Sequence, residues 1–138
     1  MRPEPLFHAR PEAAVSYGPD GPAIDEAALV ALAEIIGVKA LDSVVTVMLD
    51  STPALCASMA RAHAAGDAAA LRTAAHQLKG SAANLGARRL PTVCAELEQV
   101  AGAGDLVAAA PLVAEAQREY GRVHAALAAA TLGAFAAR

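Results

Sequence analysis

Aromatic residues are scarce in this chain of 138 residues, at 3% of the sequence. A β fold would need more aromatic and β-branched side chains to cover its sheets. Alanine dominates instead, and alanine has the highest helix propensity. The length suits one domain around one core. We therefore expect a single, closely packed all-α domain.

An excess of charge and a long apolar run are also missing. The formal net charge is −3 and no basic run stands out, which argues against a nucleic-acid-binding protein. No stretch of about 18 apolar residues is free of charge, so we expect no transmembrane helix. Residues 1–11 contain Arg, Glu and Pro without an apolar centre, unlike a signal peptide. These features indicate a cytoplasmic protein that does not bind a membrane.

Cysteine is rare, and familiar cofactor motifs do not occur. Cys56 and Cys94 are far apart without CxxC spacing, which fits reduced, buried thiols. No Gly-rich phosphate loop or other nucleotide-binding motif is found, so we expect no use of ATP by this chain. Ligand spacing on one helix is lacking for His63, His76 and His124. We therefore expect neither a metal nor a cofactor in this chain.

Apolar residues recur at spacings of three and four in five segments, separated by Gly and Asp residues that suit helix ends. Asp25, Asp67 and Asp105 are placed to cap the first, third and fifth helices. Four long helices with narrow apolar seams and short turns predict an antiparallel up-down four-helix bundle, with the short first helix at one end. The four seams are Leu41, Val45, Met48, Thr52, Leu55 and Met59; Leu71, Ala75, Leu78, Ala82 and Leu85; Leu90, Cys94, Leu97 and Ala101; and Leu106, Ala109, Val113, Ala116, Tyr120, Val123 and Leu127.

Two prolines fall inside these expected helices. Pro53 removes one backbone hydrogen bond, so we expect it to kink the second helix or divide it. Pro111 lies in the second turn of the fifth helix, which we expect to bend or to begin later. Most other prolines lie in residues 1–23, which we expect to form a flexible tail. The bundle then spans residues 24–130, and residues 131–138 form the end of the last helix or a second tail.

His76 lies on the wrong side of the third helix for burial. At about 100° per residue, it is roughly 140° from the centre of the apolar seam. Gly80 follows one turn later, and a mid-helix Gly costs about 1 kcal/mol relative to Ala while leaving the approach to the ring open. Lys79 supplies a cation within reach of a group on the ring. An exposed imidazole, an open flank and a nearby ammonium group suit the binding of a phosphoryl group.

The segment of residues 74–87, AAHQLKGSAANLGA, resembles the signature of the histidine-containing phosphotransfer (HPt) family. The likeness extends over about residues 24–128, and includes Ala-Gly-Asp at 65–67 and Cys-Ala-Glu-Leu-Glu at 94–98. The resemblance implies a four-helix bundle in which the phosphoryl group binds Nε2 of His76. It also implies that the Mg²⁺ and most of the catalytic groups come from a partner receiver domain.

This resemblance implies a phosphocarrier in a multistep phosphorelay, without its own ATP site. His76 would accept a phosphoryl group from the receiver domain of a hybrid histidine kinase and pass it to the receiver domain of a response regulator. Lys79 would stabilise the phosphoryl group, and Gly80 would give access to the ring. We expect a cytoplasmic monomer, and the tail favours a stand-alone protein.

A docking face for the receiver domain is expected around His76. Its arginines would give this end a positive field that complements the acidic phosphorylation pocket of a receiver. Two other functions are left open by the sequence: a scaffold bundle that docks receiver or kinase domains without phosphorylation, and a bundle that binds a metal or cofactor. The expected docking residues are Ala69, Arg72, Thr73, Ala83, Arg88 and Arg89.

Overall fold

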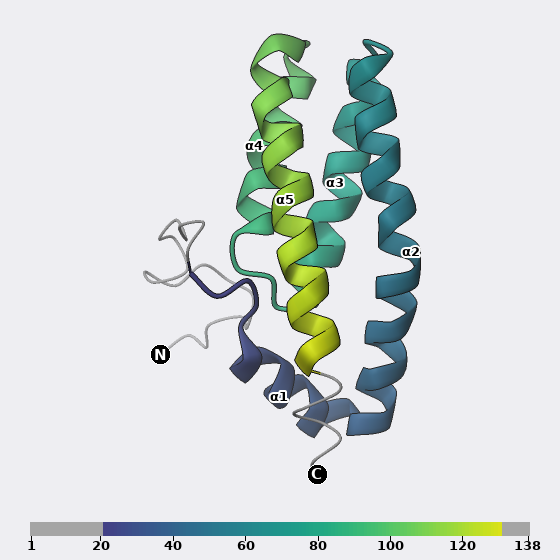
Figure 1. Cartoon of the computed structure of the whole chain (residues 1–138), viewed down its shortest axis with the longest axis vertical. Helices are drawn as coiled ribbons and strands as arrows, with labels where there is room; N and C mark the ends of the chain where they lie inside the picture. The colour runs from purple at the N-terminus through teal and green to yellow at the C-terminus, as the bar shows by residue number, and fades with distance from the viewer. Residues whose placement is uncertain (1–20, 131–138) are drawn as a thin grey trace, which may run out of the picture.

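The computed structural model describes residues 21–130, which form helices and no strand (Figure 1). The short helix α1 lies across one end of a bundle of four long helices. In this bundle α2 packs on α3, α3 on α4, α4 on α5, and α5 on α2. The predicted all-α bundle with a short N-terminal helix is therefore confirmed. The helices are α1 (Glu26–Ile36), α2 (Val38–Ala64), α3 (Ala68–Asn84), α4 (Leu90–Gly102) and α5 (Leu106–Ala130).

The helix ends follow the local chemistry of the sequence. The carboxylates of Asp25, Asp67 and Asp105 each accept a hydrogen bond from the amide three residues later, at 3.3, 3.0 and 3.0 Å. Gly86 follows the end of α3 with φ of +75°, a left-handed conformation that favours glycine. A Cβ at Gly86 would also lie 3.2 Å from the carbonyl oxygen of Asp25, a tight contact with backbone that disfavours a side chain in the turn between α3 and α4.

The predicted seams form the core of the bundle. Every seam residue of α3 and α4 is buried, as are most of those in α2 and α5. Met48 and Leu55 of α2, and Leu106 and Tyr120 of α5, are only partly buried against this core. Burial of one Leu side chain contributes about 1.5–3 kcal/mol, so the seam of α3 fixes the rotation of that helix. Its opposite face is thereby turned outward.

Both interior prolines lie in unbroken helices. Helix α2 runs through Pro53, and α5 runs through Pro111 from its first turn at Leu106. Of the two effects expected of each proline, the division of the second helix and the later start of the fifth are therefore wrong. A kink at Pro53 and a bend at Pro111 stay predictions. Both prolines are exposed, so water can reach the carbonyl left without a donor. Packing along each helix outweighs the local cost of about 3 kcal/mol for an interior proline.

Residues 21–23, which the sequence analysis assigned to the end of the tail, contact the bundle instead. Ala23 is buried, and its carbonyl accepts a hydrogen bond from the backbone amide of Arg88 at 3.0 Å. This segment therefore packs against the connection between α3 and α4, because it buries an apolar side chain and satisfies a backbone amide there. Residues 1–20 and 131–138 lie outside the described part of the chain.

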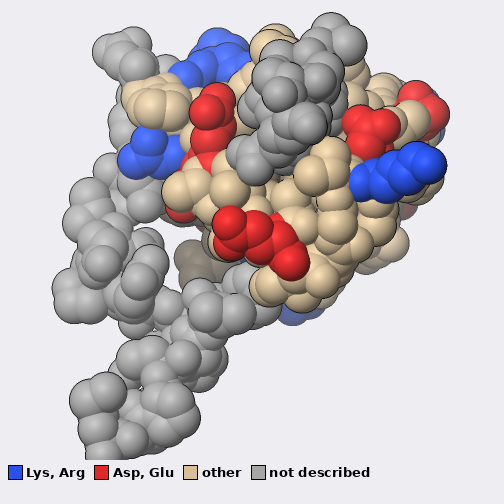
Figure 2. Space-filling model, turned by 90° about the horizontal axis from the view of Figure 1, so that it is seen from below, with Lys and Arg blue, Asp and Glu red and all other residues tan. Residues whose placement is uncertain are grey.

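The end of the molecule formed by α1 and the start of α2 has large uncharged areas between separate acidic and basic side chains (Figure 2). Ile35 of α1 and Val47 of α2 are exposed at 72% and 62%. Helix α2 is long and apolar enough to cross a membrane when judged by length and composition alone. Core helices of soluble proteins meet the same criteria. In this structure, the buried face of α2 packs against α1, α3 and α5.

Candidate functional site

The imidazole of His76 lies on the outer face of α3, as the seam predicted. Its side chain is 66% exposed, whereas the seam neighbours Ala75 and Leu78 are buried. One turn later, a Cβ added to Gly80 would meet no heavy atom within 4 Å. The flank of the ring is therefore open, and another molecule can approach it.

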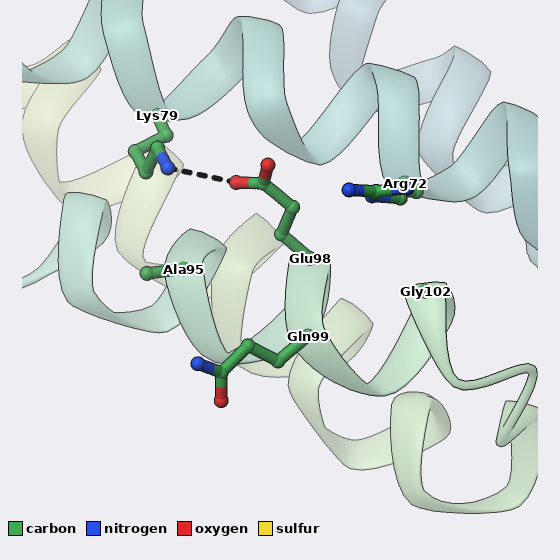
Figure 3. Close-up of a pocket in the computed structure, with 6 residues that line it drawn as sticks. All are labelled: Arg72, Lys79, Ala95, Glu98, Gln99 and Gly102. Atoms are coloured by element: carbon green, nitrogen blue, oxygen red, sulfur yellow. Dashed lines mark hydrogen bonds and ion pairs between the residues drawn. The ribbon is translucent and has the colours of Figure 1, made fainter.

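Glu98 of α4 bonds to both His76 and Lys79. Its Oε2 lies 2.9 Å from Nδ1 of His76, and its Oε1 accepts a hydrogen bond from Nζ of Lys79 at 2.8 Å (Figure 3 shows the second contact). The hydrogen bond from Lys79 is the main cause that lowers the pKa of Glu98, and the bond to His76 lowers it further against the effect of desolvation. Glu98 is therefore a carboxylate at neutral pH.

This carboxylate determines which ring nitrogen of His76 is available for reaction. An ionised carboxylate only accepts hydrogen bonds, so Nδ1 must carry the hydrogen. In the neutral ring, Nε2 then holds the free lone pair. Within residues 21–130, Nε2 makes no hydrogen bond. The geometry therefore leaves Nε2 as the nucleophilic atom on the exposed side of the site.

Two open hollows lie beside Glu98. The first has a volume of about 460 Å³ and contains the ring of His76 in its wall. The second has a volume of about 410 Å³ and lies between α3 and α4 (Figure 3). Arg72 and Glu98 line both. The first is lined by Ala69, Arg72, Thr73, His76, Gln77 and Glu98, and the second by Arg72, Lys79, Ala95, Glu98, Gln99 and Gly102.

The structure brings together part of the predicted docking face. Ala69, Arg72 and Thr73 line the same hollow as His76. Ala83 is exposed two turns beyond His76 on the same helix. These residues form one surface of α3 that faces away from the core.

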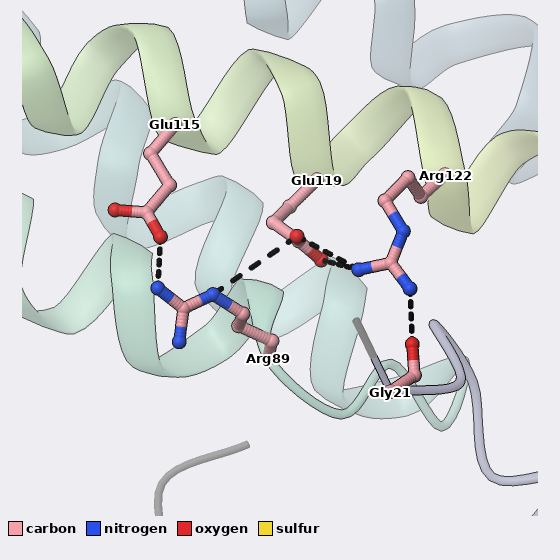
Figure 4. A network of polar contacts seen from close by, with 5 residues as sticks. All are labelled: Gly21, Arg89, Glu115, Glu119 and Arg122. Atoms are coloured by element: carbon pink, nitrogen blue, oxygen red, sulfur yellow. Dashed lines mark hydrogen bonds and ion pairs between the residues drawn. The ribbon is translucent and has the colours of Figure 1, made fainter. Parts of the chain in front are cut away.

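Arg88 and Arg89, by contrast, line neither hollow. The backbone amide of Arg88 bonds to the N-terminal segment. The side chain of Arg89 is 18% exposed and pairs with Glu115, and its Nε lies 4.0 Å from Glu119 (Figure 4). The expected contribution of Arg89 to a positive field at His76 is therefore not found, because acidic side chains of α5 neutralise its charge.

Glu119 is the centre of this second network. It is 1% exposed, and Nη1 of Arg122 donates to its two oxygens at 3.0 and 2.9 Å. Arg122 also donates to the carbonyl of Gly21 (Figure 4). The network joins α5 to the start of α4 and to the N-terminal segment, so its role is structural.

Glu98 is the residue of the site that the sequence analysis missed. In the sequence, Glu98 stands out only as part of the segment 94–98 that resembles the HPt family. A signal was present, since Glu98 follows the seam residue Leu97 and so flanks the face of α4 that packs on another helix. Its partners could be named only once the register between α3 and α4 was known.

His63, His124 and the two cysteines have surroundings that do not form a ligand site. Nε2 of His63 lies 2.9 Å from the carbonyl oxygen of Leu106, and the ring of His124 lies edge-on to Tyr120. Burial raises the pKa of Cys56 to about 11 and that of Cys94 to about 12, so both thiols stay protonated. Among the described residues, no group of three or more His, Cys, Asp or Glu is placed to hold a metal ion.

Comparison with known proteins finds a matching family and a solved structure of similar fold. The family model described as the Hpt domain matches residues 43–132, a range that contains α3, α4 and the whole site around His76. The fold is similar to the crystal structure of histidine-containing phosphotransfer protein B from Pseudomonas aeruginosa PAO1, with a TM-score of 0.76 and 30% sequence identity. That similarity covers 82% of this chain and 97% of the other. No curated protein matches the sequence.

Proposed function

The chain belongs to the HPt family and is a histidine phosphotransfer protein of a phosphorelay, and we propose that His76 is its phosphoacceptor. Members of this family are phosphocarriers that work with receiver domains. The hydrogen bond between Nδ1 of His76 and Glu98 is the observation that supports this assignment most. It presents the Nε2 lone pair on an exposed helix face beside a lysine.

In the proposed reaction, the Nε2 lone pair attacks the phosphorus of an aspartyl phosphate on a receiver domain. The new N–P bond forms as the P–O bond to the aspartate breaks, and the aspartate leaves as a carboxylate. The proton stays on Nδ1, so the product ring is positively charged. The carboxylate of Glu98 balances this charge through the existing hydrogen bond. Transfer to a second receiver reverses these steps.

Lys79 and Gly80 have distinct parts in this proposal. The ammonium group of Lys79 is held beside the ring by Glu98, where its charge stabilises the oxygens of the transferring phosphoryl group. Gly80 leaves the flank of the ring free for the receiver domain. Lys79 thus stabilises negative charge, whereas Gly80 gives the receiver domain access to the ring.

The remaining parts of the proposal concern the partners. We propose that the chain has no ATP site of its own and that Mg²⁺ is supplied by the receiver domain. The donor receiver belongs to a hybrid histidine kinase and the acceptor receiver to a response regulator. The protein acts as a monomer in the cytoplasm. The match to a family that works with receiver domains supports this arrangement.

The test is phosphoryl transfer from a labelled receiver domain in the presence of Mg²⁺, with the His76→Gln variant as control. We expect acid-labile, base-stable label on the wild type and none on the variant, with the same helical circular dichroism for both. Absence of label on the folded wild type with several receivers would instead favour the scaffold function. Capture of the unphosphorylated protein on immobilised receivers would then measure docking directly.

A further inference from the structure

Arg72 is a cation of the site that has no acidic partner within residues 21–130. Lys79 and Arg72 lie on opposite sides of Glu98, and only Lys79 bonds to it (Figure 3). One oxygen of Glu98 accepts a hydrogen bond from Lys79 and the other from His76, and no ion pair joins Glu98 to Arg72. The guanidinium of Arg72 is therefore available to an incoming anion.

The side chain of Arg72 lies across α4 at a position that has no side chain of its own. A Cβ added to Gly102 would lie 3.5 Å from Cδ and Nε of Arg72 and 3.8 Å from Cζ. Gly102 does not have positive φ, so its backbone admits other residues. Because Gly102 has no side chain, the surface of α4 stays open at this position, and Arg72 extends over it. A larger side chain there would compete with Arg72 for the same space.

The charges around His76 also favour an added anion. Before phosphorylation, the positive charges of Lys79 and Arg72 exceed the single negative charge of Glu98 by one. Phosphorylation adds a phosphoryl group with a charge of about −2 and makes the ring of His76 positive. The net charge of the phosphorylated site is then close to zero, and without Arg72 it would be about −1. A guanidinium fork also fits the paired oxygens of a phosphoryl group or a carboxylate.

We propose that Arg72, extended over Gly102, binds the oxyanion that comes to His76. This oxyanion is either the phosphoryl group itself or a carboxylate from the acidic pocket of the receiver domain. The inference rests on the proposed role of His76 as phosphoacceptor and assigns the anion-binding group of that site. Gly102 is a positioning residue, since it acts through the placement of Arg72.

The test compares phosphoryl transfer from a labelled receiver to the wild type and to Arg72→Gln and Arg72→Lys. We expect Arg72→Gln to reduce the transfer rate by about tenfold, the size typical of one lost charge-assisted hydrogen bond. Arg72→Lys should keep the charge but lose the fork, and so recover only part of the rate. Arg118→Gln is the matched control, because it removes an exposed arginine of α5 with the same change in net charge.

Gly102→Leu tests the position of the side chain without removing its charge. We expect it to lower the transfer rate in the wild type and to have little further effect in an Arg72→Gln background, since both changes remove the same interaction. Thermal melts of each variant confirm that the bundle is folded.

Two readouts separate the sources of the anion. A shorter lifetime of the isolated phosphoprotein in Arg72→Gln identifies the phosphoryl group, and a higher half-saturating receiver concentration identifies a partner carboxylate. Wild-type values for rate, lifetime and half-saturation in Arg72→Gln, with the wild type labelled on His76, would overturn this inference and leave the proposed function intact. A wild type that takes no label would overturn both.

Discussion

Gly80 lies in the interior of α3 although the fold does not require a glycine there. A Cβ at this position would meet no heavy atom within 4 Å, and Gly80 does not have positive φ. A mid-helix Gly costs about 0.5–1 kcal/mol relative to Ala. We therefore expect Gly80→Ala to raise the free energy of unfolding by about this amount. For a domain of this size, Tm should rise by about 1.5–5 °C.

A larger side chain at the same position should impair function without unfolding the protein. Gly80→Leu places an isobutyl group one turn from His76, on the flank that the receiver domain is proposed to cover. Forcing such a group into a packed interface costs about 1–3 kcal/mol. The rate of transfer should then fall roughly 5- to 150-fold. Single-turnover transfer from a labelled receiver measures this loss.

Gly121 supplies the matched control for both measurements. It lies in the interior of α5, is exposed, and has no heavy atom within 4 Å of an added Cβ. Gly121→Ala should stabilise the protein as much as Gly80→Ala does in urea unfolding, and Gly121→Leu should leave transfer unchanged. Normal transfer by folded Gly80→Leu would refute the role of the open flank. Destabilisation by Gly80→Ala would show that the fold itself needs this glycine.

Three further predictions concern the charged groups. Lys79→Ala should keep the fold but slow transfer or shorten the lifetime of the phosphohistidine, and unchanged values for both would remove Lys79 from the mechanism. The lowered pKa of Glu98 means that its ionised form stabilises the folded state above its ordinary pKa of 4.5 and that this stabilisation is lost on acidification. The difference in unfolding free energy between wild type and Glu98→Gln should therefore shrink from about pH 7 to about pH 3.5, and a constant difference would contradict this. Glu119→Ala removes the buried carboxylate that accepts two hydrogen bonds from Arg122, whose side chain is 31% exposed, and should cost about 1.5–3 kcal/mol in urea unfolding. A loss below about 1 kcal/mol would show that the network matters little.

The face of α3 that carries the site could be predicted because it depends on one helix alone. The seam through Leu71 and Leu78 sets the rotation of the helix, and the position of His76 outside the core follows from the angle between residues. Glu98 could not be assigned in the same way. A seam shows that α4 packs against another helix, but it gives neither the identity of that helix nor the register.

The same limit explains why the structure differs from the predictions for Pro53 and Arg89. The prediction that Pro53 divides its helix considers only the backbone hydrogen bond that proline removes. Helix α2 is also stabilised by packing on three other helices, which the local sequence does not reveal. Arg89 was expected to be a surface charge, yet its partner Glu115 lies 26 residues away on α5. The sequence shows which residues carry charge. The tertiary fold decides which of those charges face one another.

The most direct test of the account is the position of the phosphoryl group on the phosphorylated protein. Nitrogen-15 and phosphorus-31 NMR of the labelled ring identify the nitrogen that is bonded to phosphorus and the nitrogen that is protonated. The account predicts phosphorus on Nε2 of His76 and a proton on Nδ1, where Glu98 accepts its hydrogen bond. Phosphorus on Nδ1, or on any other residue, would contradict it.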